Sequence, residues 1–220
     1  MPRSIRLYLL DYPHHVTQRG INKEQIFFDE EDYNMMLKYL KEASEKTSSE
    51  IWAYCLMPNH IHLLLVPKVE HGLGRCLHLS TFRYAQYFNK KYARTGRLWQ
   101  NRYYSSIVEV ETYLWAVARY IETNPLRSGL VKSPEEWRWS SASFHLNGTP
   151  DELIKETSDW LPEVLKARYR EFLFDKADNT IIRKATQSCK PLGAESFISK
   201  LESLFNISLQ PLKKGRPHKK

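Results

Sequence analysis

The feature that most constrains this chain is a pair of apolar segments, 51–56 and 60–66, separated only by Met57-Pro58-Asn59. Short runs rich in β-branched and aromatic residues are typical of strands, and a proline-containing turn between two of them predicts an antiparallel hairpin. Two further strands and three helices are expected around the hairpin, at 12–19, 29–46, 73–94, 104–110 and 111–123. The order β-α-β-β-α-β-α predicts an α+β fold with a ferredoxin-like antiparallel sheet, the split βαβ arrangement, and helices on one face.

The remainder of the chain differs in character. We expect residues 1–133 to form the main domain, 134–210 to form a mainly helical C-terminal extension that packs on it, and 211–220 to be a basic flexible tail. No apolar run approaches the roughly 20 residues that a membrane helix needs. The three cysteines are scattered and form no CxxC pair, so we expect reduced thiols in a cytoplasmic protein that does not enter a membrane.

Positive charge is concentrated in one window of the sequence. Between Gly72 and Val108 there are seven basic residues, eight aromatic residues and no Asp or Glu, whereas the rest of the chain is nearly neutral. Basic groups interleaved with aromatic rings suit a ligand that offers phosphates and stackable bases, so nucleic acid is the favoured partner. The alternative is a helix with an aromatic stripe facing the core and a solvated cationic back.

Two histidines begin the second strand of the hairpin. Because side chains alternate along a strand, His60 and His62 point to the same face and could together hold one divalent cation. The alternative is two half-buried histidines that are hydrogen-bonded to their neighbours. The helix before Pro125 carries Tyr120 and Asn124 one turn apart. Spacing alone does not select this tyrosine, and it favours a surface tyrosine and a helix C-cap over a site.

A family resemblance joins these residues. Residues 54–65 (YCLMPNHIHLLL) resemble the signature of the single-tyrosine transposases of the HUH endonuclease superfamily. The runs 15–20, 95–103, 119–127 and 137–141 resemble the REP-associated tyrosine transposases in particular. The resemblance extends from about His15 to Ser143 and is much weaker from Leu146 onward. It departs from the family pattern at Asn101, where a glycine is expected after Gln100.

The resemblance implies a site and a reaction. His60 and His62 match the metal-binding histidines, Asn124 matches an amide-type third ligand, and the cation would be Mg2+ or Mn2+. Tyr120 matches the nucleophile that cleaves single-stranded DNA beside hairpin-forming palindromic repeats, which leaves a 5′-phosphotyrosine and a free 3′-hydroxyl. A chain of this kind would be nucleoid-associated and either a monomer or a homodimer.

Other basic and aromatic residues are candidates for DNA contacts. In the main domain these are Arg19, Arg83, Lys90, Lys91, Arg97, Trp99, Arg102 and Tyr103. In the tail, Lys213, Lys214 and Arg216 lie in a run that resembles an AT-hook core, with an unspecific basic tail as the alternative. Segment 181–205 has two short helical stretches around a Pro-Leu-Gly turn and could form an accessory DNA-binding unit.

Two other functions remain compatible with the sequence. A hairpin-binding regulatory protein with little or no cleavage activity would keep the basic window and need no metal. A metal-dependent phosphodiesterase that uses water would need no tyrosine. Covalent capture of DNA separates the transposase-like reaction from both.

Overall fold

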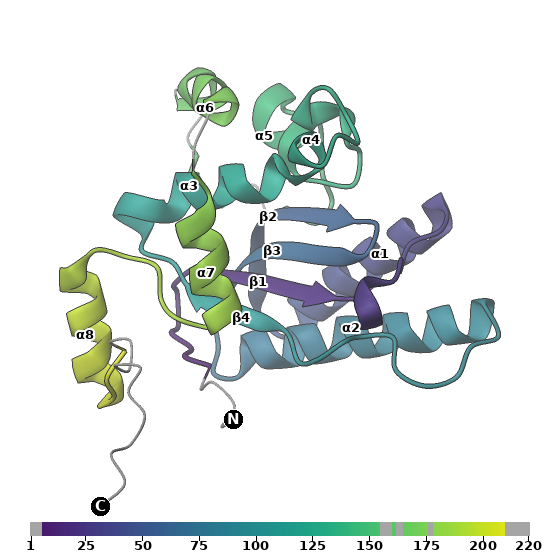
Figure 1. Cartoon of the computed structure of the whole chain (residues 1–220), viewed down its shortest axis with the longest axis horizontal. Coiled ribbons are helices and arrows are strands. Elements are labelled where there is room, and N and C mark those ends of the chain that lie inside the picture. The colour runs from purple at the N-terminus through teal and green to yellow at the C-terminus, as the bar shows by residue number, and fades with distance from the viewer. Residues whose placement is uncertain (1–5, 155–159, 162–164, 176–177, 210–220) are drawn as a thin grey trace, which may run out of the picture.

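The computed structural model describes residues 6–154, 160–161, 165–175 and 178–209. Four strands form one antiparallel sheet in the order β2-β3-β1-β4, with bounds β1 (His14–Arg19), β2 (Ser49–Met57), β3 (His60–Pro67) and β4 (Tyr104–Ile107). The crossover order and the antiparallel pairing are those of a ferredoxin-like sheet, as the sequence predicts. Figure 1 shows the strands side by side at the centre of the molecule.

Helices α1 (Glu30–Lys46) and α2 (Gly72–Lys91) cover one face of the sheet. Asp29 caps α1 by accepting a hydrogen bond from the backbone N–H of Asp32 at 3.1 Å, which satisfies one of the free donors of the first turn. Met36 and Leu40 of α1 pack with Leu77 and Phe88 of α2 in a core that includes the inward residues of β2 and β3. This face is apolar along its length.

The opposite face is also covered, which corrects the expectation of helices on one face only. Helix α3 (Val110–Glu122) crosses β2 and β3 there, and Val117 and Ile121 pack on Ala53 and Leu64. The physical reason is that the inner strand β3 is buried from Ile61 to Pro67, on both of its faces. A strand that is apolar on both faces needs cover on both.

The segments after α3 follow the rim of this second face. They comprise α4 (Asn124–Arg127), the 3-10 turn η2 (Pro134–Glu136), α5 (Ala142–Asn147) and α6 (Lys166–Phe174), while the short 3-10 turn η1 (Ile21–Lys23) follows β1. Residues 139–141 pair with the outer edge of β2, since the N–H of Leu56 donates to the carbonyl of Trp139 and the N–H of Ser141 donates to that of Tyr54. The C-terminal extension therefore shares the core of the sheet.

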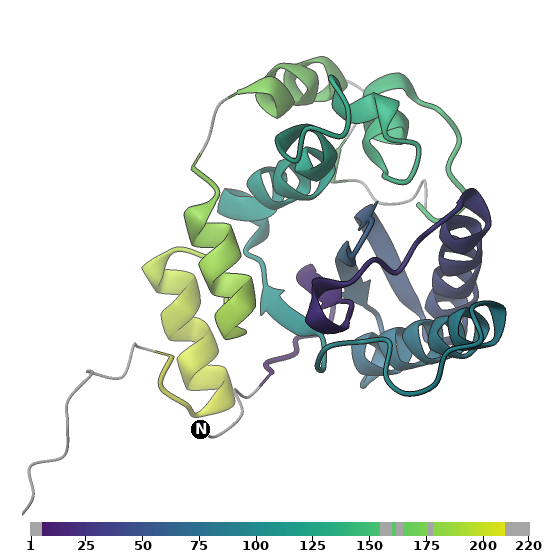
Figure 2. The ribbon, with the colours of Figure 1, turned by 45° about the vertical axis from the view of Figure 1, so that its right-hand side comes forward.

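The last two helices lie at the β4 edge of the sheet (Figures 1 and 2). Helix α7 (Thr180–Ser188) contacts β4 and β1, and α8 (Glu195–Phe205) packs with Leu7 and Ile107 in a separate apolar cluster. Between them, the N–H of Leu192 donates to the carbonyl of Ile107 and the N–H of Glu109 donates to that of Leu192, both at 2.8 Å. This pairing extends the sheet and fixes the C-terminal end of α7.

Among the described residues, no helix combines the length and apolarity needed to cross a bilayer.

Candidate functional site

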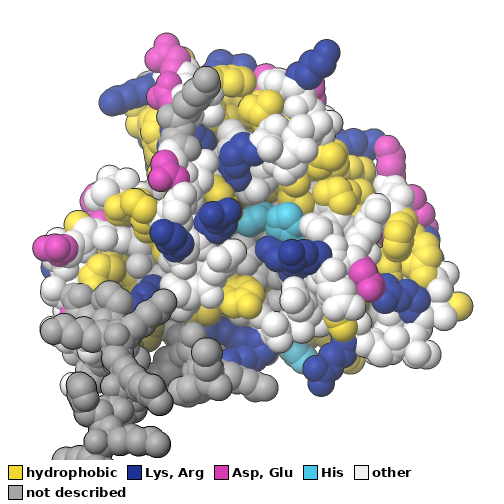
Figure 3. All heavy atoms as spheres, in the orientation of Figure 1, with side chains coloured by type: hydrophobic (Ala, Val, Ile, Leu, Met, Phe, Trp, Pro, Cys, Tyr) yellow, Lys and Arg dark blue, Asp and Glu magenta, His cyan; other side chains and the backbone are white. Residues whose placement is uncertain are grey.

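A cavity of about 290 Å³ opens on the α3 face of the sheet, where the apolar packing of α3 ends. Its walls come from β1, β3, the start of β4, the loop before β4, α3, α4 and α7. The lining residues are His15, Thr17, Arg19, His60, His62, Gln100, Asn101, Arg102, Tyr104, Tyr120, Asn124, Arg183, Thr186 and Gln187. In Figure 3, histidine side chains lie in a hollow of this face with Lys and Arg side chains around it. The four predicted core site residues, His60, His62, Tyr120 and Asn124, are therefore brought together.

Strand register explains the position of the histidines. In the pairing of β1 with β3, Thr17 lies opposite His62 and Arg19 lies opposite His60, and the alternate residues Ile61 and Leu63 enter the α1/α2 core. The rings of His60 and His62 have centroids 4.8 Å apart. The period-2 argument from the sequence thus places both imidazoles on the cavity side.

Both imidazoles are held in their neutral form. Burial lowers the pKa of His60 to about 4, with a smaller effect from the charge of Arg19. Burial also lowers the pKa of His62 well below its ordinary value, with smaller effects from His60 and His15. The Nδ1 of His60 lies 2.6 Å from Oδ1 of Asn59, which can only accept, so Nδ1 carries the proton and Nε2 keeps a free lone pair. A neutral ring with one anchored nitrogen is the usual form of a metal-binding histidine.

His15 belongs to the site although the sequence argument did not select it. Its Nε2 lies 3.0 Å from Nδ1 of His62 and its Nδ1 lies 2.7 Å from Oγ1 of Thr186. His15 is 1% exposed, and burial lowers its pKa to about 3. The available signal was the alternation of His15, Thr17 and Arg19 in a buried strand, which places three polar side chains on the face that carries His60 and His62.

Tyr120 lies at the end of α3, between the histidines and a guanidinium group. Its ring centroid is 5.6 Å from that of His62 and 5.5 Å from that of His15. The guanidinium carbon of Arg127 lies 4.5 Å from the centroid of the Tyr120 ring. Arg127 also donates to the backbone carbonyl of Tyr120 at 3.0 Å, which ties α4 to the end of α3. The cation therefore packs on the face of the Tyr120 ring as a cation–π contact.

Asn124 caps the end of α3 and also lines the cavity. Its Nδ2 donates to the carbonyls of Tyr120 at 2.8 Å and Ile121 at 3.2 Å, as a residue that caps the end of a helix would. Its Oδ1 accepts a hydrogen bond from Arg127 at 2.9 Å. A carbonyl-type oxygen has a second lone pair, so this amide can still act as an oxygen ligand.

The donor set fits a divalent cation with open coordination positions. Within the described part of the chain, no three His, Cys, Asp or Glu side chains gather as metal ligands. A cation in this cavity would depend on the Nε2 atoms of His60 and His62 and the oxygen of Asn124. Two imidazoles and one amide oxygen suit Mn2+ or Mg2+ and leave room for phosphate oxygens.

The DNA-contact candidates separate into two groups. Arg19 and Arg102 line the cavity, while a groove of about 670 Å³ between α2 and residues 96–103 is lined by Arg97, Trp99, Arg102 and Tyr103. Asn101 and Arg102 line both hollows. Trp99 is half-buried, and its Nε1 donates to the carbonyl of Thr81 at 2.9 Å. One face of the Tyr103 ring is covered by Arg6 at 4.0 Å. Both rings thus support the groove wall as well as lining it.

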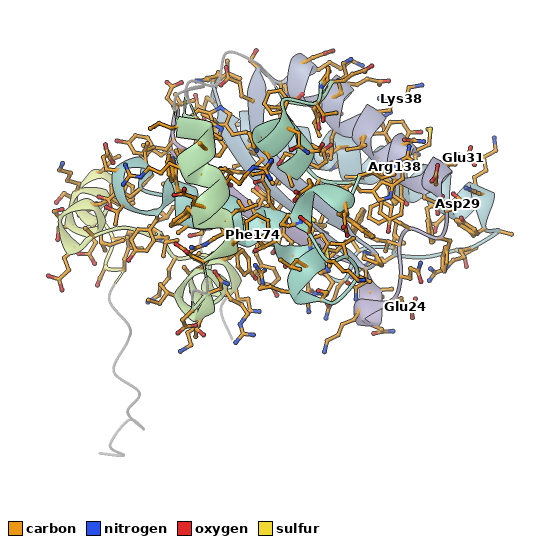
Figure 4. All side chains as sticks on the ribbon, turned by 90° about the horizontal axis from the view of Figure 1, so that it is seen from above. Glu24, Asp29, Glu31, Lys38, Arg138 and Phe174 are labelled. Carbon is orange, nitrogen blue, oxygen red and sulfur yellow. The ribbon has the colours of Figure 1, made fainter. Side chains whose placement is uncertain are left out.

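The second group lies elsewhere. Arg83 is paired with Glu42 and stacked on Tyr39, and the ammonium of Lys91 lies within 3.0 Å of carboxylates of Asp29, Glu31 and Asp32. Neither residue lines the cavity or the groove, and neither does the exposed Lys90. Figure 4 shows Asp29 and Glu31 at the opposite end of the molecule from α8. These lysines and Arg83 therefore do not join the site, because acidic residues of α1 hold Arg83 and Lys91. Lys213, Lys214 and Arg216 lie outside the described residues.

The departure at Asn101 leaves the loop intact. The N–H of Gln100 donates to the carbonyl of Arg19, and Nε2 of Gln18 donates to the carbonyl of Asn101 at 2.8 Å. Asn101 does not adopt a positive φ, so this position does not require glycine.

Comparisons with known proteins agree with this geometry. A curated protein of Haemophilus influenzae, described as "Putative REP-associated tyrosine transposase", is 31% identical over 116 residues, which are 48% of this chain and 64% of that protein. The match thus spans less than two thirds of its length. A solved structure of a REP-associated tyrosine transposase bound to a REP hairpin superposes with a TM-score of 0.58 and 18% identity, over 70% of this chain and 92% of the other. That likeness confirms the fold.

The expected resemblance to REP-associated tyrosine transposases is confirmed by these relatives. The sequence model described as "Transposase IS200 like" matches residues 9–124, which include every strand, helices α1 to α3 and the four core site residues. The chain belongs to the IS200-like transposase family.

Proposed function

We propose that this chain is a metal-dependent single-stranded DNA endonuclease and strand transferase that cleaves beside palindromic hairpin repeats through a 5′-phosphotyrosine intermediate. The observation that carries the proposal is the cavity in which Tyr120 lies beside His60 and His62 under the guanidinium of Arg127. Both relatives described above are REP-associated tyrosine transposases, and one of them is bound to a REP hairpin. They support a hairpin DNA as the substrate.

The proposed reaction uses few groups of the chain. The phenol oxygen of Tyr120 loses its proton and attacks phosphorus, the bond from phosphorus to the 3′-oxygen breaks, and the departing oxygen takes up a proton to become a 3′-hydroxyl. Arg127 holds the Tyr120 ring in place, and Arg19 and Arg102 hold the phosphates that flank the scissile bond. Mg2+ or Mn2+ held by His60, His62 and Asn124 would offset charge on the phosphoryl oxygens. A second 3′-hydroxyl can reverse the step, so strand transfer needs no ATP.

The groove beside the cavity supports a single-stranded ligand. It shares the lining residues Asn101 and Arg102 with the cavity, and its lining also includes the exposed ring of Phe82 and the guanidinium of Arg97. No Asp or Glu lines it. Rings and cations along an open groove suit unpaired bases joined by phosphates.

The test is covalent capture. Labelled single-stranded DNA carrying hairpins from the source genome is incubated with the protein and Mn2+, Mg2+ or EDTA, and the products are separated on a denaturing gel. We expect a protein–DNA band that requires metal and is absent in Tyr120→Phe. The matched control is Tyr113→Phe, which changes another tyrosine of α3 that does not line the cavity.

Three outcomes would contradict the proposal. A covalent band that persists in Tyr120→Phe would assign the attack to another residue. Tight hairpin binding without a covalent band in either metal would favour the regulatory binding protein instead. Metal-dependent turnover without a covalent band would favour a phosphodiesterase that uses water.

A further inference from the structure

The C-terminal extension reaches the candidate metal site through one side chain. Thr186 of α7 lies 2.7 Å from Nδ1 of His15, whose Nε2 lies 3.0 Å from Nδ1 of His62. Thr186 and His15 are 3% and 1% exposed, so water does not compete for these hydrogen bonds. Thr186 lies outside the residues 9–124 that match the family.

The direction of the hydrogen bonds follows from the single proton of a hydroxyl. Oγ1 of Thr186 also lies 3.0 Å from the carbonyl of Ile182, which can only accept, so the hydroxyl satisfies both contacts together only when it donates to Ile182. Toward His15 it can then only accept, so Nδ1 of His15 carries a proton and its Nε2 does not. Nδ1 of His62 must in turn donate to His15. The chain of bonds leaves Nε2 of His62 unprotonated, with its lone pair free.

The reverse arrangement would give the opposite result. If Thr186 donated to His15, then Nε2 of His15 would donate to His62, and the proton of His62 would be on Nε2. That tautomer offers no lone pair to the cavity, because its only unprotonated nitrogen is hydrogen-bonded to His15. The two arrangements are mutually exclusive, and only the first also satisfies the contact between Thr186 and the carbonyl of Ile182.

The position of Thr186 is itself fixed. Ser106 of β4 donates to the carbonyl of Lys190 at 2.6 Å, just after the end of α7, and the pairing of Leu192 with Ile107 follows directly. Ile182, one turn before Thr186, packs in the same core as α3. Helix α7 also brings Arg183 and Gln187 to the cavity wall. These contacts fix the position of Thr186 relative to the sheet that carries His15 and His62.

We propose that Thr186 is a positioning residue for the divalent cation, because it fixes through His15 the His62 tautomer whose Nε2 is free to bind metal. The inference rests on the metal dependence of the proposed function. It also gives the C-terminal extension a part in the site that the family region alone does not supply.

The test compares variants by two readouts that do not depend on DNA cleavage. Thr186→Val keeps the shape of the side chain and removes the hydroxyl, Thr186→Ser keeps the hydroxyl, and Ser188→Ala removes an exposed hydroxyl from the same helix. Mn2+ affinity is measured by calorimetry. The tautomer of His62 is read from its ring ¹⁵N shifts in the metal-free protein, and thermal unfolding checks that each variant is folded.

We expect Thr186→Val to bind Mn2+ about 10- to 100-fold more weakly, as is typical when a residue that orients a ligand is lost. The unpaired Nδ1–H of His15 would then favour the other tautomer of His15, and the His62 signals should shift toward the Nε2–H form. Thr186→Ser should restore both readouts to within about threefold of the original protein, and Ser188→Ala should leave both unchanged.

Separate outcomes overturn the inference and the proposed function. Unchanged Mn2+ affinity or an unchanged His62 tautomer in folded Thr186→Val would overturn the inference alone, provided that the original protein still forms its metal-dependent covalent band. An original protein that binds no Mn2+ would overturn the metal-dependent function. It would also remove the proposed role of the His62 tautomer in metal binding. The tautomer measurement in the metal-free protein distinguishes the two cases.

Discussion

The two faces of the central sheet are built from the same strands but have opposite character. On the α1/α2 face, Ile61, Leu63 and Val16 belong to a continuous apolar core. On the α3 face, apolar packing covers Ala53 and Leu64 and then gives way to a cavity lined by His15, His60 and His62. Neighbouring residues of one strand therefore have different roles, depending on the face of the sheet to which they point. The first face holds the strands in register, and the second uses that register to hold side chains for chemistry.

The difference between the two faces follows from where the helices that cover them end. Helix α3 ends at Glu122, and the short α4 turns away under Pro125, so no long helix covers the end of β3 that carries His60. The remaining side of the cavity is closed by α7 from the distant C-terminal extension. The site occupies the part of the sheet that hydrophobic packing leaves open.

Among single substitutions, the largest expected effect is a loss of stability on the apolar face alone. Leu63→Ala removes a fully buried side chain of the α1/α2 core and should lower the free energy of unfolding by about 2–5 kcal/mol. Thr17→Ala, on the cavity wall of the neighbouring strand, should change it by less than about 0.5 kcal/mol. Urea unfolding measures both variants, and equal losses would remove the distinction between the faces.

The next effect tests a property that both faces share. Burial lowers the pKa of His14, on the side of Val16, to about 4, and that of His60 and His15, on the cavity side, to about 4 and about 3. These rings stay neutral in the folded protein, whereas the unfolded chain takes up protons below about pH 6.5. Acidification from pH 7 to pH 5 should therefore lower the free energy of unfolding of the metal-free protein, by about 2 kcal/mol for each such histidine.

Urea unfolding at the two pH values checks this expectation. His14→Gln should reduce the loss of unfolding free energy between pH 7 and pH 5 by the contribution of one histidine. His71→Asn, at an exposed position, should not alter it. Stability that is unchanged between pH 7 and pH 5 would contradict the neutral, buried state of these rings.

The smallest expected effect separates the cations of the cavity from those of the α1/α2 face. Arg102→Ala removes a guanidinium shared by the cavity and the groove, and should make the salt dependence of single-stranded DNA binding shallower by about 0.7 in log K per log salt. Lys91→Ala should leave that slope unchanged, because Asp29 and Asp32 already neutralise Lys91. Titrations between 50 and 200 mM salt measure the slope. An equal change in both variants would mean that DNA contacts both faces.

Much of the fold follows from the sequence because it depends on local patterns. The hairpin around Pro58, the capped start of α1 and the helix that ends before Pro125 lie within a few residues of their expected bounds. The same alternation that predicts a strand places His60 and His62 on one face. Local periodicity carried these predictions, since each depends on neighbours within one or two turns.

The rest of the site depends on contacts between distant segments. Nothing in the pattern near His15 indicates that Thr186 lies against it, because the two are 171 residues apart. The intramolecular partners of Lys91 come from the start of α1, so a basic window in the sequence did not distinguish available cations from neutralised ones. The second covered face was also missed, because burial of both faces of β3 cannot be told from periodicity in so short a run.

The hydrogen bond between His15 and Thr186 can form only after Thr186 has been synthesised, which is later than the sheet and Tyr120. At about 5–20 residues per second, a ribosome needs several seconds to extend the chain from Tyr120 to Thr186. In that interval the sheet and the tyrosine exist, but α7 has not yet closed the cavity. A nascent chain would thus contain Tyr120, His60 and His62 before it contains Thr186, the residue that we propose to support His62.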